Sequence, residues 1–345
     1  MNQPTPPAPS FSVISGAQVA EVISGNEEQV TRIIEAAYRL HGEGLTVNPD
    51  SYFLTFPDRP SSRIIALPAS VKGDVDVHGI KWISSFPENV AAGLPRASAV
   101  LILNDVHTGY PFACLESSVI SAARTAASAA LAAAELSKQR GGRPARVGFI
   151  GTGLIARFIH TYLAGTGWAW DELGVHDLSA EHAKEFGRYL GRTEDGTITI
   201  HETAEELIRS SDLIVFATVA GQPHVTEPSW FAHNPLVLHI SLRDLSPEIV
   251  LVSHNITDDV EHCMKANTSL HLTEQLVGNR DFVTGTLFDV LEGRAACPPD
   301  RPVVFSPFGL GVLDLAVAKY IHARLAGDGA LHTVPDFFTE LKRYG

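Results

Sequence analysis

The sequence predicts an α/β protein of two domains, one built on a doubly wound parallel sheet and the other of α+β type. The first observation is the length of 345 residues, which exceeds what one hydrophobic core usually organises. The second is a series of short β-prone runs between residues 51 and 115. The third is an alternation of strand-like and helical segments after residue 146. We place the domains at 1–130, completed by 315–345, and at 131–314.

Composition limits the classes of partner. The chain carries a formal net charge of −13, with 45% hydrophobic and 19% charged residues. An acidic body repels nucleic acid and anionic membrane surfaces, so we expect neither as a partner. The sequence contains no run of 18 apolar residues and no signal-peptide pattern at its start. Cys114, Cys263 and Cys297 are widely spaced and odd in number, which is typical of reduced thiols. We therefore expect a soluble cytoplasmic protein.

The first domain is expected to contain a helix, a sheet and a second helix. "EEQVTRIIEAAYRLH" places its apolar residues at helical spacing. "SYFLTF", "RIIALPA", "GIKWISSF", "SAVLILND" and "YPFACLE" are β-prone runs, which predict an antiparallel or mixed sheet with a hairpin turn at "NDVHTGYP". Residues 117–139 are dense in alanine and predict a long helix that "RGGRP" ends.

The second domain alternates strands and helices. "RVGFIG", "ELGVHD", "TITI", "DLIVFATV", "LVLHISL" and "HNITDD" are apolar runs of the kind found in buried parallel strands. Helical segments are expected near 154–165, 179–191 and 203–210, and "PVVFSPFG" as a last strand. This order is typical of a doubly wound sheet. The helix "VLDLAVAKYIHARLAG" is expected to return to the first domain.

A glycine turn suggests a dinucleotide site. Gly151, Gly153 and Ala156 form G-x-G-x-x-A, in which small residues allow a tight turn and close approach of a pyrophosphate to the helix N-terminus. Asp177 ends the next strand 26 residues after Gly151, near the spacing at which a carboxylate binds the ribose hydroxyls. "HDLSAEH" contains no arginine for a 2′-phosphate, so this Rossmann-like domain favours NAD over NADP. An ordinary βα turn with a capping aspartate is the alternative. The full set of predicted cofactor contacts is Gly151, Thr152, Gly153, Leu154, Ile155, Asp177, Thr218, Val219 and Ser241.

Several charged residues stand among apolar neighbours. Arg124 is a lone charge in the alanine-rich helix, and a buried guanidinium needs an anion, either a ligand or a structural carboxylate. Lys81 in "GIKWISSF" either binds a ligand or faces solvent, and Arg63 at "RIIALP" is more ambiguous. Asp244 follows "LVLHISLR", where ligands of open α/β sheets bind, and it can serve there as a general base or merely cap the next turn. We expect no metal site, although Glu261 to Cys263 with His271 superficially suggests one.

Longer stretches resemble a known family. "GIKWISSFPENVAAGLP", "DVHTGYPFACLE", "ISAARTAASAALAA" and "GFIGTGLIARF" resemble the ornithine cyclodeaminase/mu-crystallin family from about Arg63 to Ala318. "RIIALPA", "HISLRDLSPEI", "TSLHLTEQ" and "FSPFGLGVLDLAVA" resemble its branch that makes L-2,3-diaminopropionate for siderophores and peptide antibiotics.

The resemblance implies a homodimer that pairs through the N-terminal domain, and it assigns roles to specific residues. By this comparison Asp244 is catalytic, and Arg63, Lys81 and Arg124 bind the carboxylates of the substrate. We predict a catalytic role for Lys81 as well, and Arg96 and Arg243 as further substrate-binding residues. Arg243 stands where ornithine cyclodeaminases have a small, glycine-rich run, so it changes the charge of the pocket and argues against ornithine.

The reaction implied is an NAD-dependent oxidative cleavage of N-(2-amino-2-carboxyethyl)-L-glutamate. Hydride leaves the glutamyl Cα, and hydrolysis of the resulting imine gives 2-oxoglutarate and L-2,3-diaminopropionate, with Asp244 handling the protons. Three alternatives remain open from the sequence. They are a true ornithine cyclodeaminase, an imine reductase or alanine-type dehydrogenase, and a mu-crystallin-like protein that binds a nucleotide and a small ligand.

Overall fold

The computed structural model describes residues 9–192 and 196–339. Contacts within the chain divide it into two units, which are described separately. Unit 1 comprises Met1–Asn26, Arg32–Arg124 and Leu310–Gly345. Unit 2 comprises Glu27–Thr31 and Thr125–Gly309.

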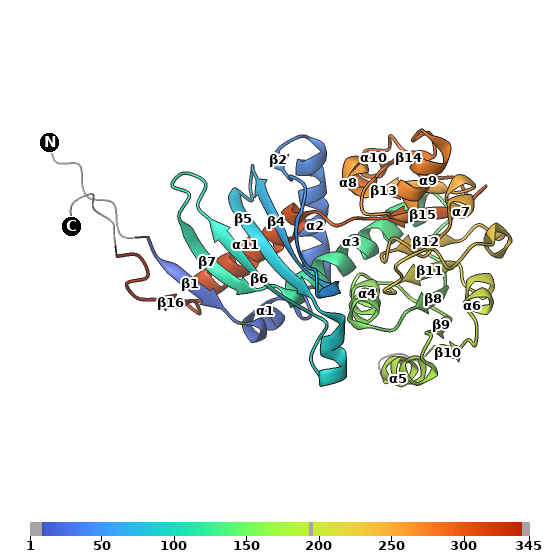
Figure 1. Ribbon diagram of the computed structural model, residues 1–345, viewed down its shortest axis with the longest axis horizontal. Helices are drawn as coiled ribbons and strands as arrows, with labels where there is room; N and C mark the ends of the chain where they lie inside the picture. The colour runs from blue at the N-terminus through green and yellow to red at the C-terminus, as the bar shows by residue number, and fades with distance from the viewer. Residues whose placement is uncertain (1–8, 193–195, 340–345) are drawn as a thin grey trace. The chain divides into compact units, whose positions relative to one another are not determined.

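Unit 1 is built on a mixed sheet in the order β16-β1-β7-β6-β5-β4-β2, with β3 paired to β4 (Figure 1). β1 pairs in parallel with β7, and the other strands pair antiparallel, so the expectation of an antiparallel or mixed sheet is confirmed. The predicted hairpin turn joins β6 to β7, where Asp105 N–H donates to the Tyr110 carbonyl at 2.9 Å. The strands are β1 (Phe11–Ile14), β2 (Thr46–Val47), β3 (Tyr52–Phe56), β4 (Arg59–Val71), β5 (Val77–Ser85), β6 (Ala97–Asn104), β7 (Pro111–Glu116) and β16 (His332–Val334).

Helices cover one face of this sheet. The C-terminal helix α11 packs against β4, β5 and β6, as Figure 1 shows, so the expectation that the last helix returns to the first domain is confirmed. Along α11 most residues are buried, which agrees with its apolar sequence on all sides. The helices with residues in unit 1 are α1 (Gly16–Ile23), α2 (Glu27–Gly42), the 3₁₀ turn η1 (Pro87–Ala92), α3 (Ser118–Lys138) and α11 (Gly311–Gly327). α3 is long and apolar enough to span a membrane, but 67% of that stretch is buried, as in a core helix.

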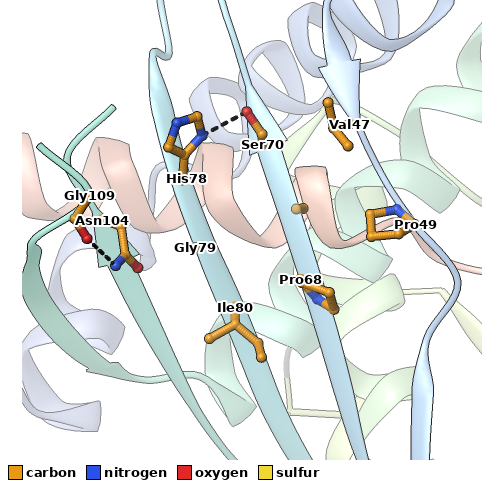
Figure 2. A pocket seen from close by; sticks show the side chains of 10 residues that line it. Val47, Pro49, Pro68, Ser70, His78, Gly79, Ile80, Asn104 and Gly109 are labelled. Atoms are coloured by element: carbon orange, nitrogen blue, oxygen red, sulfur yellow. Dashed lines mark hydrogen bonds between the residues drawn. The ribbon is translucent and has the colours of Figure 1, made fainter. Parts of the chain in front are cut away.

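The opposite face of the sheet is open and partly apolar. Alternation along β5 directs Lys81 toward the helices, whereas His78, Ile80 and Trp82 share the other face. Trp82 and Val100 lie directly opposite each other there, and each is 42% exposed. A hollow of about 460 Å³ lies on the same face, and in Figure 2 His78 points toward Ser70 at its rim, with 2.8 Å between Nδ1 and Oγ.

Unit 2 contains a parallel sheet in the order β10-β9-β8-β11-β12-β15-β13-β14. The first strand of the unit, β8, pairs with β9 on one side and with β11 on the other, so the chain reverses its winding between β8 and β11. This is the predicted doubly wound order, and ligands bind at such a switch point beyond the carboxyl ends of the strands. The strands are β8 (Arg146–Ile150), β9 (Glu172–His176), β10 (Thr197–Ile200), β11 (Leu213–Phe216), β12 (Leu236–His239), β13 (His254–Thr257), β14 (Val283–Thr286) and β15 (Val303–Ser306).

The core of unit 2 explains why its strands are continuously apolar. Every residue of β11 and β12 is buried, because helices cover both faces of a doubly wound sheet. A Cβ added at Gly148 would lie 2.4 Å from Ser211 Oγ and 2.5 Å from Leu207 Cδ2, so α6 packs directly on β8. The helical elements are α4 (Leu154–Gly165), α5 (Ala180–Leu190), α6 (Ala204–Ser210), η2 (Pro228–Phe231), α7 (Pro247–Leu251), α8 (Val260–Cys263), α9 (Ser269–Val277) and α10 (Leu287–Leu291).

Candidate active site

The glycine turn lies between β8 and α4 in unit 2, as predicted. Gly151 has a φ of +85°, and a Cβ there would lie 2.7 Å from the Ala217 carbonyl oxygen, so the turn packs against the chain that leaves β11. Gly153 is the N-cap of α4 and has no side chain to cap the helix. Apart from its own chain neighbours, no atom of the described residues lies within 4 Å of where its Cβ would be. Free backbone N–H groups facing open space at a helix N-terminus suit a phosphate.

Asp177 lies beside this turn, directly after β9. Its Oδ2 accepts hydrogen bonds from Thr152 N at 3.1 Å and from Thr152 Oγ1 at 2.9 Å. Its Oδ1 accepts from Ser179 N at 2.9 Å. The carboxylate is therefore held at the edge of the turn, where it supports the turn and can reach a ribose. Leu154 and Ile155, at the start of α4, are only partly covered.

Asp244 occupies a buried position directly past β12, and four side chains converge on its carboxylate. Oδ1 accepts from Thr218 Oγ1 and lies 3.1 Å from His224 Nε2. Oδ2 accepts from Ser241 Oγ and lies 3.2 Å from His239 Nε2. Two predicted cofactor contacts, Thr218 and Ser241, are thus partners of Asp244, whereas Val219 is exposed.

Hydrogen bonding keeps this carboxylate ionised. Burial alone raises the pKa of Asp244, but hydrogen bonds from His224, His239 and Ser241 and the charge of His239 together outweigh burial. The pKa of Asp244 is consequently held well below its usual range. Asp244 is also 0% exposed, so in this structure it contacts neighbouring side chains rather than solvent.

Backbone bonds fasten the two loops that carry these residues. His224 N and Val225 N both donate to the Asp244 carbonyl, at 3.0 and 2.9 Å, and Val225 forms a parallel bridge with Leu245. The turn before Asp244 contains Leu242 at a φ of +71°, a left-handed conformation that costs a non-glycine residue energy. Such conformations concentrate at functional sites, because the surrounding bonds have to enforce them.

Sequence reasoning missed His224 and His239. His239 is the last residue of β12, and His224 lies in the loop "AGQPHV" after β11. Position at or past the carboxyl end of a strand, close to the criterion that selected Asp244, is the signal that could have found both of them.

In unit 1, Lys81 and Arg124 share one carboxylate that the sequence did not indicate. Lys81 Nζ lies 2.6 Å from Asp314 Oδ2, and Arg124 Nε lies 3.3 Å from Asp314 Oδ1. Lys81 is 1% exposed, so the alternative that it faces solvent is wrong. Burial lowers the pKa of Lys81 to about 8, Asp314 partly offsets this effect, and the charge of Arg124 adds to it. For Arg124, the anion present in this structure is the structural carboxylate.

Arg63 and Arg96 form a second cationic group on the same face of the sheet. Arg63 lies opposite Ser85 in the β4–β5 ladder, and Arg96 Nη1 donates to Ser85 Oγ at 3.2 Å. Burial and the charge of Arg63 both lower the pKa of Arg96. Arg63 Nε is buried without a hydrogen-bond partner. Within residues 9–192 and 196–339, neither guanidinium pairs with a carboxylate, so the two arginines create an unneutralised positive site.

Arg243 has a different environment from these arginines. Its Nε and Nη2 donate to the Ala266 carbonyl at 3.1 and 2.8 Å. The predicted contact between Arg243 and substrate therefore stays a prediction. Among the residues that the structure describes, no group of three or more His, Cys, Asp or Glu side chains is arranged to hold a metal ion.

Comparison with known proteins gives a consistent picture. The model of the ornithine cyclodeaminase/mu-crystallin family matches residues 13–329. N-((2S)-2-amino-2-carboxyethyl)-L-glutamate dehydrogenase of Staphylococcus aureus is 28% identical over 318 residues, which cover 88% of this chain and 92% of that protein. Alanine dehydrogenase of Archaeoglobus fulgidus is 27% identical over 320 residues, covering 90% and 94%. The fold matches Δ1-pyrroline-2-carboxylate reductase of Thermococcus litoralis, solved with NADH and L-proline, at a TM-score of 0.84 and 23% identity, covering 94% and 100%.

Lys81, Arg124 and Asp314 form a buried ion triad, and breaking this triad should lower the stability of the protein. Asp314→Asn keeps the shape of the side chain but leaves Lys81 and Arg124 without an anion, and removing one partner of a buried ion pair costs about 3–5 kcal/mol of unfolding free energy. Urea unfolding should show this loss. Asp328→Asn is the matched control, because Asp328 pairs at 3.3 Å with Arg324 on the exposed end of α11 and its loss should change stability little. Equal unfolding midpoints for the two variants would show that the triad does not stabilise unit 1.

Proposed function

The chain belongs to the ornithine cyclodeaminase/mu-crystallin family, and from this premise we propose that it is an NAD-dependent oxidoreductase acting on a secondary amine of amino-acid type. The proposed substrate is N-(2-amino-2-carboxyethyl)-L-glutamate, which is cleaved with water to 2-oxoglutarate and L-2,3-diaminopropionate. Siderophore or peptide-antibiotic synthesis would consume the second product. The observation that carries the proposal is the Arg63–Arg96 pair with no carboxylate partner.

The charges of unit 1 fit a substrate with three carboxylates. Lys81 and Arg124 share the single negative charge of Asp314, which leaves one net positive charge in the triad. Arg63 and Arg96 add two more. Lys81 and Ser85 share one face of β5 and lie about 13 Å apart along the strand, a span that long cationic side chains can bridge toward one ligand. Alanine and proline each offer one carboxylate, so they would leave most of this charge unmatched.

The glycine turn and Asp177 would hold the cofactor. Gly151 and Gly153 leave room for a pyrophosphate at the N-terminus of α4, and the Asp177 carboxylate would accept hydrogen bonds from the ribose hydroxyls. When bound, NAD supplies a hydride acceptor for the substrate Cα. Val219, Thr218 and Ser241 lie past β11 and β12, beyond which a nicotinamide would extend. We assign proton handling to the group around Asp244.

The open face of the unit 1 sheet is the proposed dimer interface. Trp82, Val100, Tyr52 and Leu54 expose apolar surface there, and a large exposed apolar face on a sheet needs a cover. A second copy of this chain fits, because a two-fold axis can place the same apolar face against itself. We expect this homodimer in the cytoplasm.

The proposed reaction is tested by supplying purified protein and NAD with a panel of amines. N-(2-amino-2-carboxyethyl)-L-glutamate should produce NADH, 2-oxoglutarate and L-2,3-diaminopropionate in equal amounts, while L-alanine and L-proline give far slower NADH formation. Absorbance of NADH and amino-acid analysis measure the products. Ornithine converted to proline and ammonia without net NADH would instead establish a cyclodeaminase. Nucleotide binding without turnover of any amine would favour a binding protein.

Asp177 should decide cofactor choice. A carboxylate at this position attracts ribose hydroxyls and repels a 2′-phosphate, so NAD should bind far more tightly than NADP. Asp177→Ala should weaken NAD about 10–100-fold, the usual worth of a hydrogen bond to a charged group, and narrow the gap to NADP. Calorimetric titration measures both affinities. Thr152→Val is the control, because it removes only the side-chain hydrogen bond from Thr152 to Asp177. Equal affinities of the unaltered protein for NAD and for NADP would refute the assignment of Asp177 to the ribose.

The dimer face makes a separate prediction. Trp82→Lys combined with Val100→Lys places like charges together across the expected two-fold interface, so the dimer should dissociate. Sedimentation velocity measures the mass. Val252→Lys is the control, since Val252 is similarly exposed, at 45%, but belongs to unit 2. A doubly substituted protein that stays dimeric would place the interface elsewhere.

A further inference from the structure

We infer that His224 transfers the protons of this reaction, with the buried Asp244 carboxylate as the partner that orients it. The inference deepens the proposed function and rests on it for the identity of the substrate. The sequence assigned proton transfer to Asp244, whereas this inference assigns it to the neighbouring side chain of His224.

The position of His224 is set by backbone contacts that do not depend on its ring. Its N–H and that of Val225 donate to the Asp244 carbonyl, and Ser246 N donates back to Val225 O at 2.9 Å. This short parallel ladder fixes the loop after β11 against the turn after β12. Both loops lie beyond strand carboxyl ends next to the switch between β8 and β11, where ligands of this fold bind.

The same carboxylate links His224 to the glycine turn. Gly151 packs on the backbone of Ala217 and Thr218, and Thr218 Oγ1 donates to Asp244 Oδ1. His224 Nε2 lies 3.1 Å from that same oxygen. Thr218 and Asp244 thus connect the glycine turn to His224. A ligand that binds at the turn and extends past β11 would come close to His224.

An ionised carboxylate at Nε2 determines which ring nitrogen is free. A carboxylate can only accept, so the neutral imidazole carries its hydrogen on Nε2 and keeps a lone pair on Nδ1. Within the described ranges, no hydrogen bond reaches Nδ1, and the side chain is 43% exposed. His224 thus presents a basic nitrogen to its surroundings, whereas the oxygens of Asp244 are enclosed.

His239 does not offer this combination. Its Nδ1 lies 3.1 Å from Ser306 Oγ and its Nε2 lies within 3.2 Å of Asp244, and the residue is 0% exposed. Arg243, between the two loops' anchor points, is turned to the Ala266 carbonyl. Among the described residues, Asp244 contacts His224 directly, and His239 contacts Asp244 in turn.

Each step of the proposed cleavage requires a proton transfer that one histidine can make. The substrate nitrogen enters as an ammonium, and Nδ1 removes one of its protons, which then passes to solvent. NAD held at the glycine turn would accept the Cα hydride, and loss of that hydride would leave a protonated C=N bond. Nδ1 next takes a proton from the water that adds to the carbon and returns it to the nitrogen, the C–N bond breaks, and the hydroxyl proton moves to the departing amine. One substrate, one NAD and one water give the keto acid, a primary ammonium, NADH and one proton.

Kinetics of matched variants test this role. His224→Gln should lower kcat by about 10²–10⁴-fold, the usual contribution of a general acid–base group, while NAD affinity by calorimetry is unchanged. The acidic limb of the kcat–pH profile should disappear, because it reports protonation of the base. Added imidazole should partly restore turnover in His224→Ala, which a purely structural histidine would not allow.

The control is His233→Gln. His233 also forms a hydrogen-bond contact through Nε2, which lies 2.9 Å from the Ser211 carbonyl oxygen. Ser211 precedes the amino end of β11, whereas His224 follows its carboxyl end. His233→Gln should retain the kcat and pH profile of the unaltered protein. If His224→Gln retained them too, or if imidazole failed to rescue His224→Ala, the inference would be overturned.

A readout without turnover tests the geometry itself. Nitrogen-15 NMR of the ligand-free protein should show neutral His224 protonated at Nε2 and bare at Nδ1, and Asp244→Ala, which removes the acceptor, should abolish that preference. Protonation of Nδ1 in the unaltered protein would contradict the inference.

The two proposals fail in different ways. If the secondary amine is not cleaved but another amine of the panel is, the proposed function fails and His224 is tested on that amine by the same variants. A protein that turns over no amine would overturn both.

Discussion

The ionised carboxylate of Asp244 is the constraint on which the candidate site depends. Two loops leave the sheet after β11 and β12, and side chains from both of them converge on this anion. A hydrogen bond to a charged group contributes about 1.5–3 kcal/mol, so several such bonds can hold the left-handed turn at Leu242. The side chains of Thr218, Ser241 and His224 all turn toward this one charge. The Asp244 side chain is thereby better suited to organising its neighbours than to exchanging protons with solvent.

In unit 1 a buried carboxylate neutralises cationic side chains instead of holding loops together. Asp314 neutralises part of the charge of Lys81 and Arg124 and holds both side chains beneath the sheet. No such partner reaches Arg63 and Arg96 in the described parts of the chain, and Arg96 has its pKa lowered by burial and by the charge of Arg63. Two like charges held close together repel each other, and an anion that binds both of them relieves this repulsion. Unlike Lys81 and Arg124, the Arg63–Arg96 pair has no carboxylate partner within the described residues, and for this reason it carries the proposal of a substrate site.

Much of the fold could be predicted because its signals are local. The alanine-rich α3 and the parallel strands from β8 to β13 follow from periodicity and apolar runs in short windows. β1, β2, β14 and β16 were not predicted, because each has at most four residues and is defined by its partner. β1, for example, pairs with β7 about 100 residues away. Strands of this length carry little pattern of their own.

The residues of the candidate site could likewise be predicted only where the signal for them is local in the sequence. Gly151, Asp177 and Asp244 were predicted from their positions relative to strands, and the structure places them there. The carboxylate that holds Lys81 lies 233 residues farther along the chain, so no local rule connects them. Arg124 was recognised as a charge that needs an anion, but sequence alone could not say whether the anion was a ligand or Asp314. The only signal for His224 in the sequence is its place in the loop after β11, past the carboxyl end of a strand.

The most direct test of this account is the ionisation of Asp244 in the ligand-free protein. Carbon-13 NMR can follow its carboxyl signal, identified by its absence in Asp244→Asn. An ordinary aspartate titrates near pH 3.9, and the hydrogen bonds described here hold the pKa of Asp244 well below that value. The signal should therefore remain at the ionised position from about pH 8 down to about pH 4. Titration of Asp244 within that interval would contradict the account.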